Sequence, residues 1–342
     1  MELYVNASDN IRAVGKAFDA WKDGFPSSVA LIGEKGSGKS TLSNLLTDEI
    51  FKEQKIVNIE IKQSTWKIEQ ILSLFGSAFE IKDVNRPEHI VNALNAMEER
   101  IVVNLEGLQK LYLRNINGFD ALDALWLIIS ETKGKVFWIT TCSRYAWEFL
   151  NKVEGVETHF THIFFTDALS DAHIQSVIMN RHDKSVYKLN FEADESTRKS
   201  RNYKKRLNDP KAVQEYLKEI YFERLADITE GNTSVATILW LRSIKKVERR
   251  TITISPFQPV NIETLEILKP ETLFTLAAIV LHDTLKVAEL CRVLNLTLAQ
   301  SRVLLTRLKS RGILIEEESG YYLNQLVYRQ VLRLLKRRNI IH

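Results

Sequence analysis

The sequence contains few of the residues that mark secreted or membrane-spanning proteins. Its 342 residues include only two cysteines, Cys142 and Cys291, which lie far apart and without the spacing of metal ligands. This count indicates a reducing compartment and no disulfide framework. No run approaches the roughly 18–20 apolar residues that a membrane span needs, and the N-terminus lacks the basic start and apolar run of a signal peptide. We therefore expect a soluble, cytoplasmic protein with no membrane contact.

The sequence also lacks a large excess of basic over acidic residues. The chain has 47 lysines and arginines against 43 acidic residues, a net charge of +4. Whole-chain charge therefore does not indicate a nucleic-acid partner, and the distribution of charge matters more. The length and the 45% of hydrophobic residues allow two or three separate cores.

Short apolar runs alternate with helical patterns through the first half of the chain. The predicted strands are 28–32, 56–61, 101–104, 136–140 and 162–165. This alternation predicts an α/β fold with a parallel sheet covered by helices on both faces. From 168 to 250 the pattern is helical throughout, and the prolines at 256, 259 and 270 indicate a linker. We expect a core at 1–167, a helical region at 168–250, a linker at 251–270 and a separate domain at 271–342.

A phosphate-binding loop follows the first predicted strand and precedes a predicted helix. The segment fits the pattern G-x-x-x-x-G-K-[ST] without substitution, and this context supports the assignment. Its backbone N–H groups and the helix N-terminus would hold the phosphates of ATP. Lys39 would reach the β- and γ-phosphates, and Ser40 would ligate Mg²⁺. The predicted binding residues are Gly33, Glu34, Lys35, Gly36, Ser37, Gly38, Lys39, Ser40 and Thr41.

The third predicted strand ends in polar residues that suit the second half of such a site. Asn104 stands where an aspartate would bind the metal shell, and Glu106 comes one position later than the usual polarising carboxylate. Glu106 could compensate, because residues i and i+2 share a face in extended chain. The alternative is that both simply end a strand. We predict Asn104 as a metal ligand with Ser40, and Asn104 and Glu106 as catalytic residues.

The fourth predicted strand also ends in polar residues, at 140–144. Thr141 or Ser143 could orient the attacking water, and an ordinary polar strand end is an equal alternative. We take Thr141 as the catalytic candidate.

These motifs together resemble the AAA+ ATPases and the related STAND signalling ATPases. The resemblance covers about residues 10–245 and implies a helical lid, in which Glu230–Ala236 looks like the Gly-Asn motif that opens a helix over the nucleotide. Two arginines that the family uses are missing: Ser234 stands near the lid position, and 151–162 contains no arginine. The lid arginine is either missing or replaced by Arg242, and Arg144 and Arg114 are weaker substitutes for the arginine expected in 151–162. The resemblance therefore implies slow hydrolysis, a weak ATPase or a switch.

The last 72 residues have the pattern of a winged helix-turn-helix. Helical patterns at 273–281, 287–294 and 297–310 precede a hairpin at 313–323, and Thr297 with Gln300 forms a capping box. Residues 271–342 carry 11 basic and 6 acidic residues, which gives +5. We expect Val303, Leu304 and Leu308 to face inward. The third helix, 297–310, would be the recognition helix of such a domain. We expect Arg302, Arg307 and Lys309 to face outward on it, and they are candidates for contact with double-stranded DNA.

Two functional hypotheses remain open. The order of ATPase, lid and winged helix resembles the initiator and origin-recognition ATPases, and it implies an oligomeric ATPase whose nucleotide state controls assembly on DNA. However, Glu316–Glu318 in the hairpin would repel a duplex, and many STAND regulators use this order with the winged helix docking a protein partner. A second basic run, 198–206, is flanked by acidic residues and is interpreted as a solvated loop.

Overall fold

The computed structural model describes residues 8–166, 168–256 and 269–341, and it divides into two compact units. One unit contains the P-loop sheet together with the C-terminal domain. The other runs from α7 (Asp171–His182) to β8 (Thr251–Ile254). Among the described helices, none has the length and apolarity to cross a bilayer.

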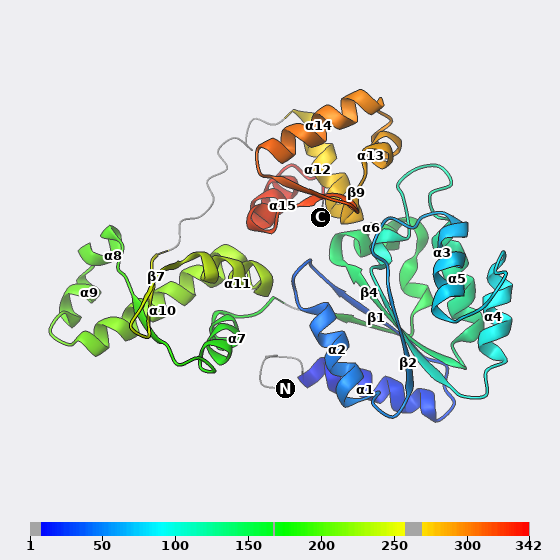
Figure 1. The fold of residues 1–342 in the computed structure, drawn as a ribbon, viewed down its shortest axis with the longest axis horizontal. Helices are drawn as coiled ribbons and strands as arrows, with labels where there is room; N and C mark the ends of the chain where they lie inside the picture. Colours follow the sequence, from blue (N-terminus) through cyan, green and yellow to red (C-terminus); the bar gives the residue numbers. More distant parts are fainter. Residues whose placement is uncertain (1–7, 167, 257–268, 342) are drawn as a thin grey trace. The chain divides into compact units, whose positions relative to one another are not determined.

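The five strands predicted for the first half of the chain form one parallel sheet (Figure 1). In spatial order they are β2 (Lys55–Glu60), β3 (Ile101–Glu106), β4 (Val136–Ser143), β1 (Ser28–Gly33) and β5 (His162–Phe165). The two central strands, β1 and β4, are buried along their whole length, as a sheet covered on both faces requires. The carboxyl ends of β1, β3 and β4 therefore lie side by side at one edge of the sheet.

Successive side chains of each strand point to opposite faces of this sheet, and those on each face pack against different helices. On one face, Phe137 packs with Phe18, Trp21 and Phe51, beside α1 and α2. On the other face, its neighbour Trp138 stacks on Phe75 of α3. The covering elements are α1 (Ser8–Lys22), α2 (Lys39–Glu49), α3 (Ile68–Ala78), α4 (Pro87–Asn95), η1 (Leu108–Lys110), α5 (Asp120–Thr132), α6 (Arg144–Glu154) and η2 (Val156–His159).

The second unit is not all helical, and the prediction for 168–250 was wrong in this respect. Three short strands, β6 (Lys188–Phe191), β7 (Ile244–Glu248) and β8, form a sheet in the order β6-β8-β7. β8 lies in the predicted linker. Each strand is only four or five residues long, so alternation was too brief to detect. The helices are α7, α8 (Glu195–Lys199), α9 (Arg201–Arg206), α10 (Pro210–Thr229) and α11 (Thr233–Arg242).

The basic run at 198–206 is also helical, which corrects its interpretation as a loop. Asp194 and Ser200 cap α8 and α9, because their side chains accept hydrogen bonds from Thr197 N–H and Tyr203 N–H.

The C-terminal domain is a winged helix, as predicted. Its elements are α12 (Pro270–His282), β9 (Thr284–Leu285), α13 (Val287–Leu294), α14 (Leu298–Ser310), β10 (Leu314–Glu317), β11 (Gly320–Leu323), η4 (Gln325–Val327) and α15 (Tyr328–Arg337). The capping box is confirmed, since Thr297 N–H donates to Gln300 Oε1 at 2.9 Å and Gln300 N–H donates to Thr297 Oγ1 at 3.3 Å.

The inward face of α14 differs from the prediction. Val303 is 60% exposed, whereas Ser301, Leu305 and Leu308 are buried. These three residues are spaced i, i+4 and i+7, and they form one helical face. The prediction failed because a small hydroxyl residue occupies the first core position and a valine stands on the outer surface.

Candidate nucleotide-binding site

The predicted phosphate loop lies between β1 and α2, at the carboxyl edge of the sheet. β1 ends at Gly33 between β4 and β5, and α2 begins at Lys39. Gly36 and Gly38 have φ values of +79° and +91°. Side-chain-bearing residues avoid this region, so the loop needs glycine at both positions. The strand, loop and helix are therefore arranged as a phosphate-binding loop requires.

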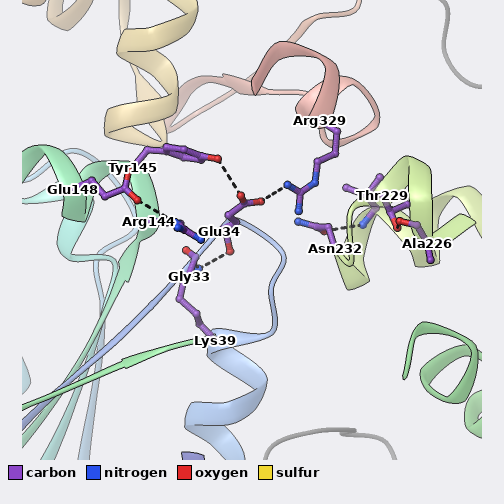
Figure 2. A network of polar contacts seen from close by, with 11 residues as sticks. Gly33, Glu34, Lys39, Arg144, Tyr145, Glu148, Ala226, Thr229, Asn232 and Arg329 are labelled. Carbon is purple, nitrogen blue, oxygen red and sulfur yellow. Dashed lines mark hydrogen bonds and ion pairs between the residues drawn. The ribbon is translucent and has the colours of Figure 1, made fainter. Parts of the chain in front are cut away.

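Lys39 is held at the centre of this loop. Its Nζ donates hydrogen bonds to Gly33 O at 2.8 Å and to Glu34 O at 2.7 Å (Figure 2). Burial lowers the pKa of Lys39 to about 8, against the opposing effect of nearby acidic groups. A phosphate close to Nζ would favour the charged form. Anion binding and protonation of Lys39 are therefore coupled, as expected for a residue predicted to bind phosphate.

Ser40 is joined to the end of β3 by Glu106. The Ser40 hydroxyl donates to Glu106 Oε2 at 2.8 Å. A hydroxyl and a carboxylate at this separation are oxygen ligands of the kind that Mg²⁺ prefers. The residues present therefore fit a magnesium ion held between α2 and β3.

Asn104 of β3 contacts Ser43, which lies about one turn further along α2 than Ser40. Its Oδ1 accepts from Ser43 Oγ at 2.8 Å, and its Nδ2 donates to Asn58 Oδ1 at 3.0 Å. Asn104 is 4% exposed. The structure thus brings Ser40 together with Glu106, and it places Asn104 against Ser43. Its predicted role as a metal ligand stays a prediction, and the geometry favours Glu106.

Thr141 holds the backbone that follows Glu106. Gly107 N–H donates to Thr141 Oγ1 at 3.2 Å, and Thr141 is buried. On the same strand, Ser143 N–H donates to Gln109 Oε1 at 3.1 Å. These bonds fix the β3–η1 turn, so Thr141 positions Glu106. Its predicted contact with an attacking water stays a prediction.

Charged residues of the C-terminal domain contact the phosphate loop, and no sequence pattern indicated them. Arg329 of α15 makes a 2.7 Å ion pair with Glu34, whose other oxygen accepts from the Tyr145 hydroxyl at 3.0 Å (Figure 2). The pair is largely shielded from solvent, with 8% of the Arg329 side chain and 15% of the Glu34 side chain exposed. Next along the loop, Lys35 pairs with Asp283 at 2.7 Å.

A neutral histidine joins α12 to the segment after η1. Arg114 N–H donates to His282 Nε2 at 3.0 Å, so the ring proton lies on Nδ1, which donates to Ala278 O at 2.8 Å. Burial lowers the pKa of His282 to about 4, which keeps the ring neutral. Tyr112 adds a hydrogen bond to Leu281 O at 2.9 Å. These satisfied polar contacts join the winged helix to the P-loop part of the same unit.

The other arginines considered as substitutes have their own surroundings. Arg144 pairs with Glu148 at 3.0 Å on the surface of α6. Arg242 is exposed at the end of α11. The predicted Gly-Asn motif does open α11, because the Asn232 side chain accepts from Val235 N–H at 3.1 Å.

The DNA candidates on α14 are not equivalent. Arg302 and Arg307 are exposed and line a shallow depression with Val303, Thr306 and Ser310. Lys309 instead makes a 2.6 Å ion pair with Glu316 in the β10–β11 hairpin, which is the wing of this domain. The two arginines therefore remain as a cationic surface, and Lys309 is engaged within the domain.

Comparison with known proteins identifies the fold. No family model matches the sequence, and no curated protein matches it. Among solved structures, the ORC2 protein of Aeropyrum pernix, in ADPNP and ADP complexes, is similar with a TM-score of 0.56 and 13% identity, covering 98% of this chain and 95% of that one. Cdc6p of Pyrobaculum aerophilum is similar with a TM-score of 0.51 and 12% identity, covering 97% and 94%. The chain therefore shares the fold of these proteins, an α/β parallel sheet with a P-loop and a C-terminal winged helix, as predicted.

Proposed function

We propose that this chain, which shares its fold with the Orc/Cdc6 ATPases, binds ATP with Mg²⁺ and hydrolyses it slowly. The observation that carries the proposal is the phosphate loop, in which Lys39 Nζ is held by two loop carbonyls and two glycines have positive φ. The similar A. pernix protein was solved with ADPNP and ADP, which supports a nucleotide in this chain.

Ser40 and Glu106 would hold the magnesium ion, whose charge would stabilise the phosphates during transfer. Glu106 would also orient water, because the geometry gives it the place nearest Ser40. We propose slow turnover, since one carboxylate serves both tasks and the 151–162 segment has no arginine.

We further propose that the nucleotide state controls association with duplex DNA through α14, and assembly with further copies or a partner protein. Arg302 and Arg307 suit phosphate contacts, which supply most of the affinity in such complexes. The carboxylates of the wing would repel a DNA duplex less than the sequence suggests. Lys309 pairs with Glu316, and the Tyr322 hydroxyl donates to Glu317 Oε1 at 2.6 Å. The ion pairs that join Glu34 to Arg329 and Lys35 to Asp283 offer a direct connection between the phosphate loop and this domain.

The alternative is a STAND-type signalling or defence switch in which the winged helix docks a protein. A specific observation favours it: Leu298 and Val303 are 59% and 60% exposed on α14. Apolar side chains on an exposed helix are suited to a protein interface.

Replacing Arg302 and Arg307 by alanine is expected to weaken binding of the full chain to a duplex of about 25 base pairs. Each lost phosphate contact reduces the slope of log affinity against log salt by about 0.9. Fluorescence anisotropy across a salt series measures this, and Val303→Ser on the same helix serves as the uncharged control. A slope lower by about two units in the arginine variant alone supports DNA recognition. An unchanged slope removes α14 from the DNA surface, and a parent that binds no duplex at low salt favours protein docking.

A further inference from the structure

The small sheet of the second unit has one apolar face and one polar face. In the register of the strands, Leu189 lies beside Ile252, which lies beside Val247, and Phe191 lies beside Ile254. Phe191 and Ile254 are buried, and Phe191 packs on Tyr221, Phe222 and Trp240. This face therefore covers the core of the unit.

The opposite face contains no apolar side chain. Alternate residues of a strand share a face, and residues paired across the three strands form a row on that face. Its six residues are Lys188, Thr251 and Glu248 in one row, and Asn190, Thr253 and Lys246 in the next. Protein interfaces have an apolar centre, which this face lacks. Lysine, threonine and asparagine are among the side chains that contact nucleic-acid phosphates.

Two arginines form the turn that joins β7 to β8. Arg249 and Arg250 lie between Glu248 and Thr251, with φ values of +44° and +63°. A two-residue hairpin turn with both φ values positive is normally built from Asn-Gly, because other side chains are strained there. Strained residues that persist in a structure cluster at functional sites. Both side chains are exposed, so packing does not explain their presence.

The charge of this hairpin is unbalanced. Residues 244–254 contain four cations, Lys245, Lys246, Arg249 and Arg250, and one carboxylate, Glu248. Glu248 pairs with Lys246 at 2.7 Å, and Lys245 reaches Glu192 of the neighbouring segment at 2.9 Å. The excess positive charge is therefore concentrated at the turn, with Lys188 beside it in the register.

We propose that the polar face of the β6-β8-β7 sheet, with the turn at Arg249 and Arg250, binds the phosphate backbone of duplex DNA. This inference rests on the proposed association with DNA, and it adds a contact that is separate in the chain from α14. A two-stranded ribbon with cations at its tip can follow a duplex, and Thr251, Thr253 and Asn190 supply hydrogen-bond donors behind it.

The test is the variant Arg249→Asn with Arg250→Gly in the full chain. Asn-Gly suits this turn, so the melting temperature is expected to stay the same or rise while two charges are lost. Anisotropy with a 30-base-pair duplex should show a salt slope lower by about two units, and affinity lower by about 10- to 60-fold near 0.1 M salt. The matched control is Lys204→Ala with Lys205→Ala on α9, which removes the same charge from exposed positions of the same unit.

The possible outcomes separate this inference from the proposed function. Loss of affinity in the turn variant, with the α9 variant close to the parent, supports the DNA-binding sheet. Equal losses in both variants would show a general effect of charge and overturn it. Normal binding by the turn variant, alongside weakened binding by the Arg302 and Arg307 variant, overturns this inference alone. A parent that binds no duplex overturns both.

Discussion

Replacing Glu106 by glutamine is expected to reduce ATP hydrolysis by about 10²- to 10⁴-fold, the range for removing a general base. The reason is geometric: Glu106 Oε2, at the carboxyl end of β3, accepts a hydrogen bond from the Ser40 hydroxyl at 2.8 Å. Glutamine has almost the same shape, so the hydrogen bond and the fold should survive while the negative charge is lost. ATP binding should change by less than about tenfold. Single-turnover phosphate release and a nucleotide titration measure the two effects separately.

Two further variants sharpen the test of Glu106. Glu106→Asp keeps the charge and should retain part of the rate. Asn104→Asp introduces a carboxylate beside Ser43 instead of Ser40, and it should not restore hydrolysis to the Glu106→Gln protein. If Glu106→Gln hydrolyses ATP like the parent, or if Asn104→Asp restores the rate, the magnesium-binding and water-orienting role has been assigned to the wrong residue.

Replacing Arg329 by methionine is expected to destabilise the protein by about 3–5 kcal/mol, because it leaves the buried Glu34 carboxylate without its cation. This corresponds to a melting temperature lower by about 6–20 °C. Replacing Glu34 by glutamine at the same time should recover much of the loss, since a neutral amide replaces the uncompensated charge. A double-mutant cycle on melting temperature isolates the contribution of the pair from the other contacts of Arg329.

The surface offers a matched control for this pair. Lys309 and Glu316 are separated by a similar distance, 2.6 Å, but half of the lysine side chain is exposed. Lys309→Met should therefore change the melting temperature far less than Arg329→Met. Equal effects of the two substitutions, or no recovery in the Glu34→Gln double variant, would contradict a buried connection between the phosphate loop and α15.

The five strands of the main sheet and the winged helix could be predicted from the sequence, because apolar runs and capping residues act locally. The strands of the second unit could not. β6 and β8 pair across about 60 residues, and each has only four residues in which to show alternation. On α14, burial of Ser301 and exposure of Val303 depend on what lies opposite each side chain, which hydrophobicity does not encode.

The site divides in the same way. The strand, loop and helix around Gly33–Thr41 could be predicted because the pattern lies in consecutive residues, and binding of phosphate by this loop stays a prediction. The partner of Ser40 was less certain: Asn104 and Glu106 are two positions apart on one strand, and only the contact with α2 shows which of them reaches the hydroxyl. Arg329 and Asp283 gave no signal, since each lies more than 240 residues beyond its partner in the loop.

The central claim is that the loop from Gly33 to Thr41 binds a nucleoside triphosphate through Lys39. Titration of the full chain with a fluorescent ATP analogue and Mg²⁺, compared with Lys39→Ala, tests it most directly, and exposed Lys52→Ala after α2 is the control. Charged hydrogen bonds contribute about 1.5–3 kcal/mol each. We expect saturable binding by the parent and the control, and an affinity at least about a hundredfold lower for Lys39→Ala. Binding of equal affinity by Lys39→Ala, or no binding by the parent, would contradict the assignment of the phosphate loop.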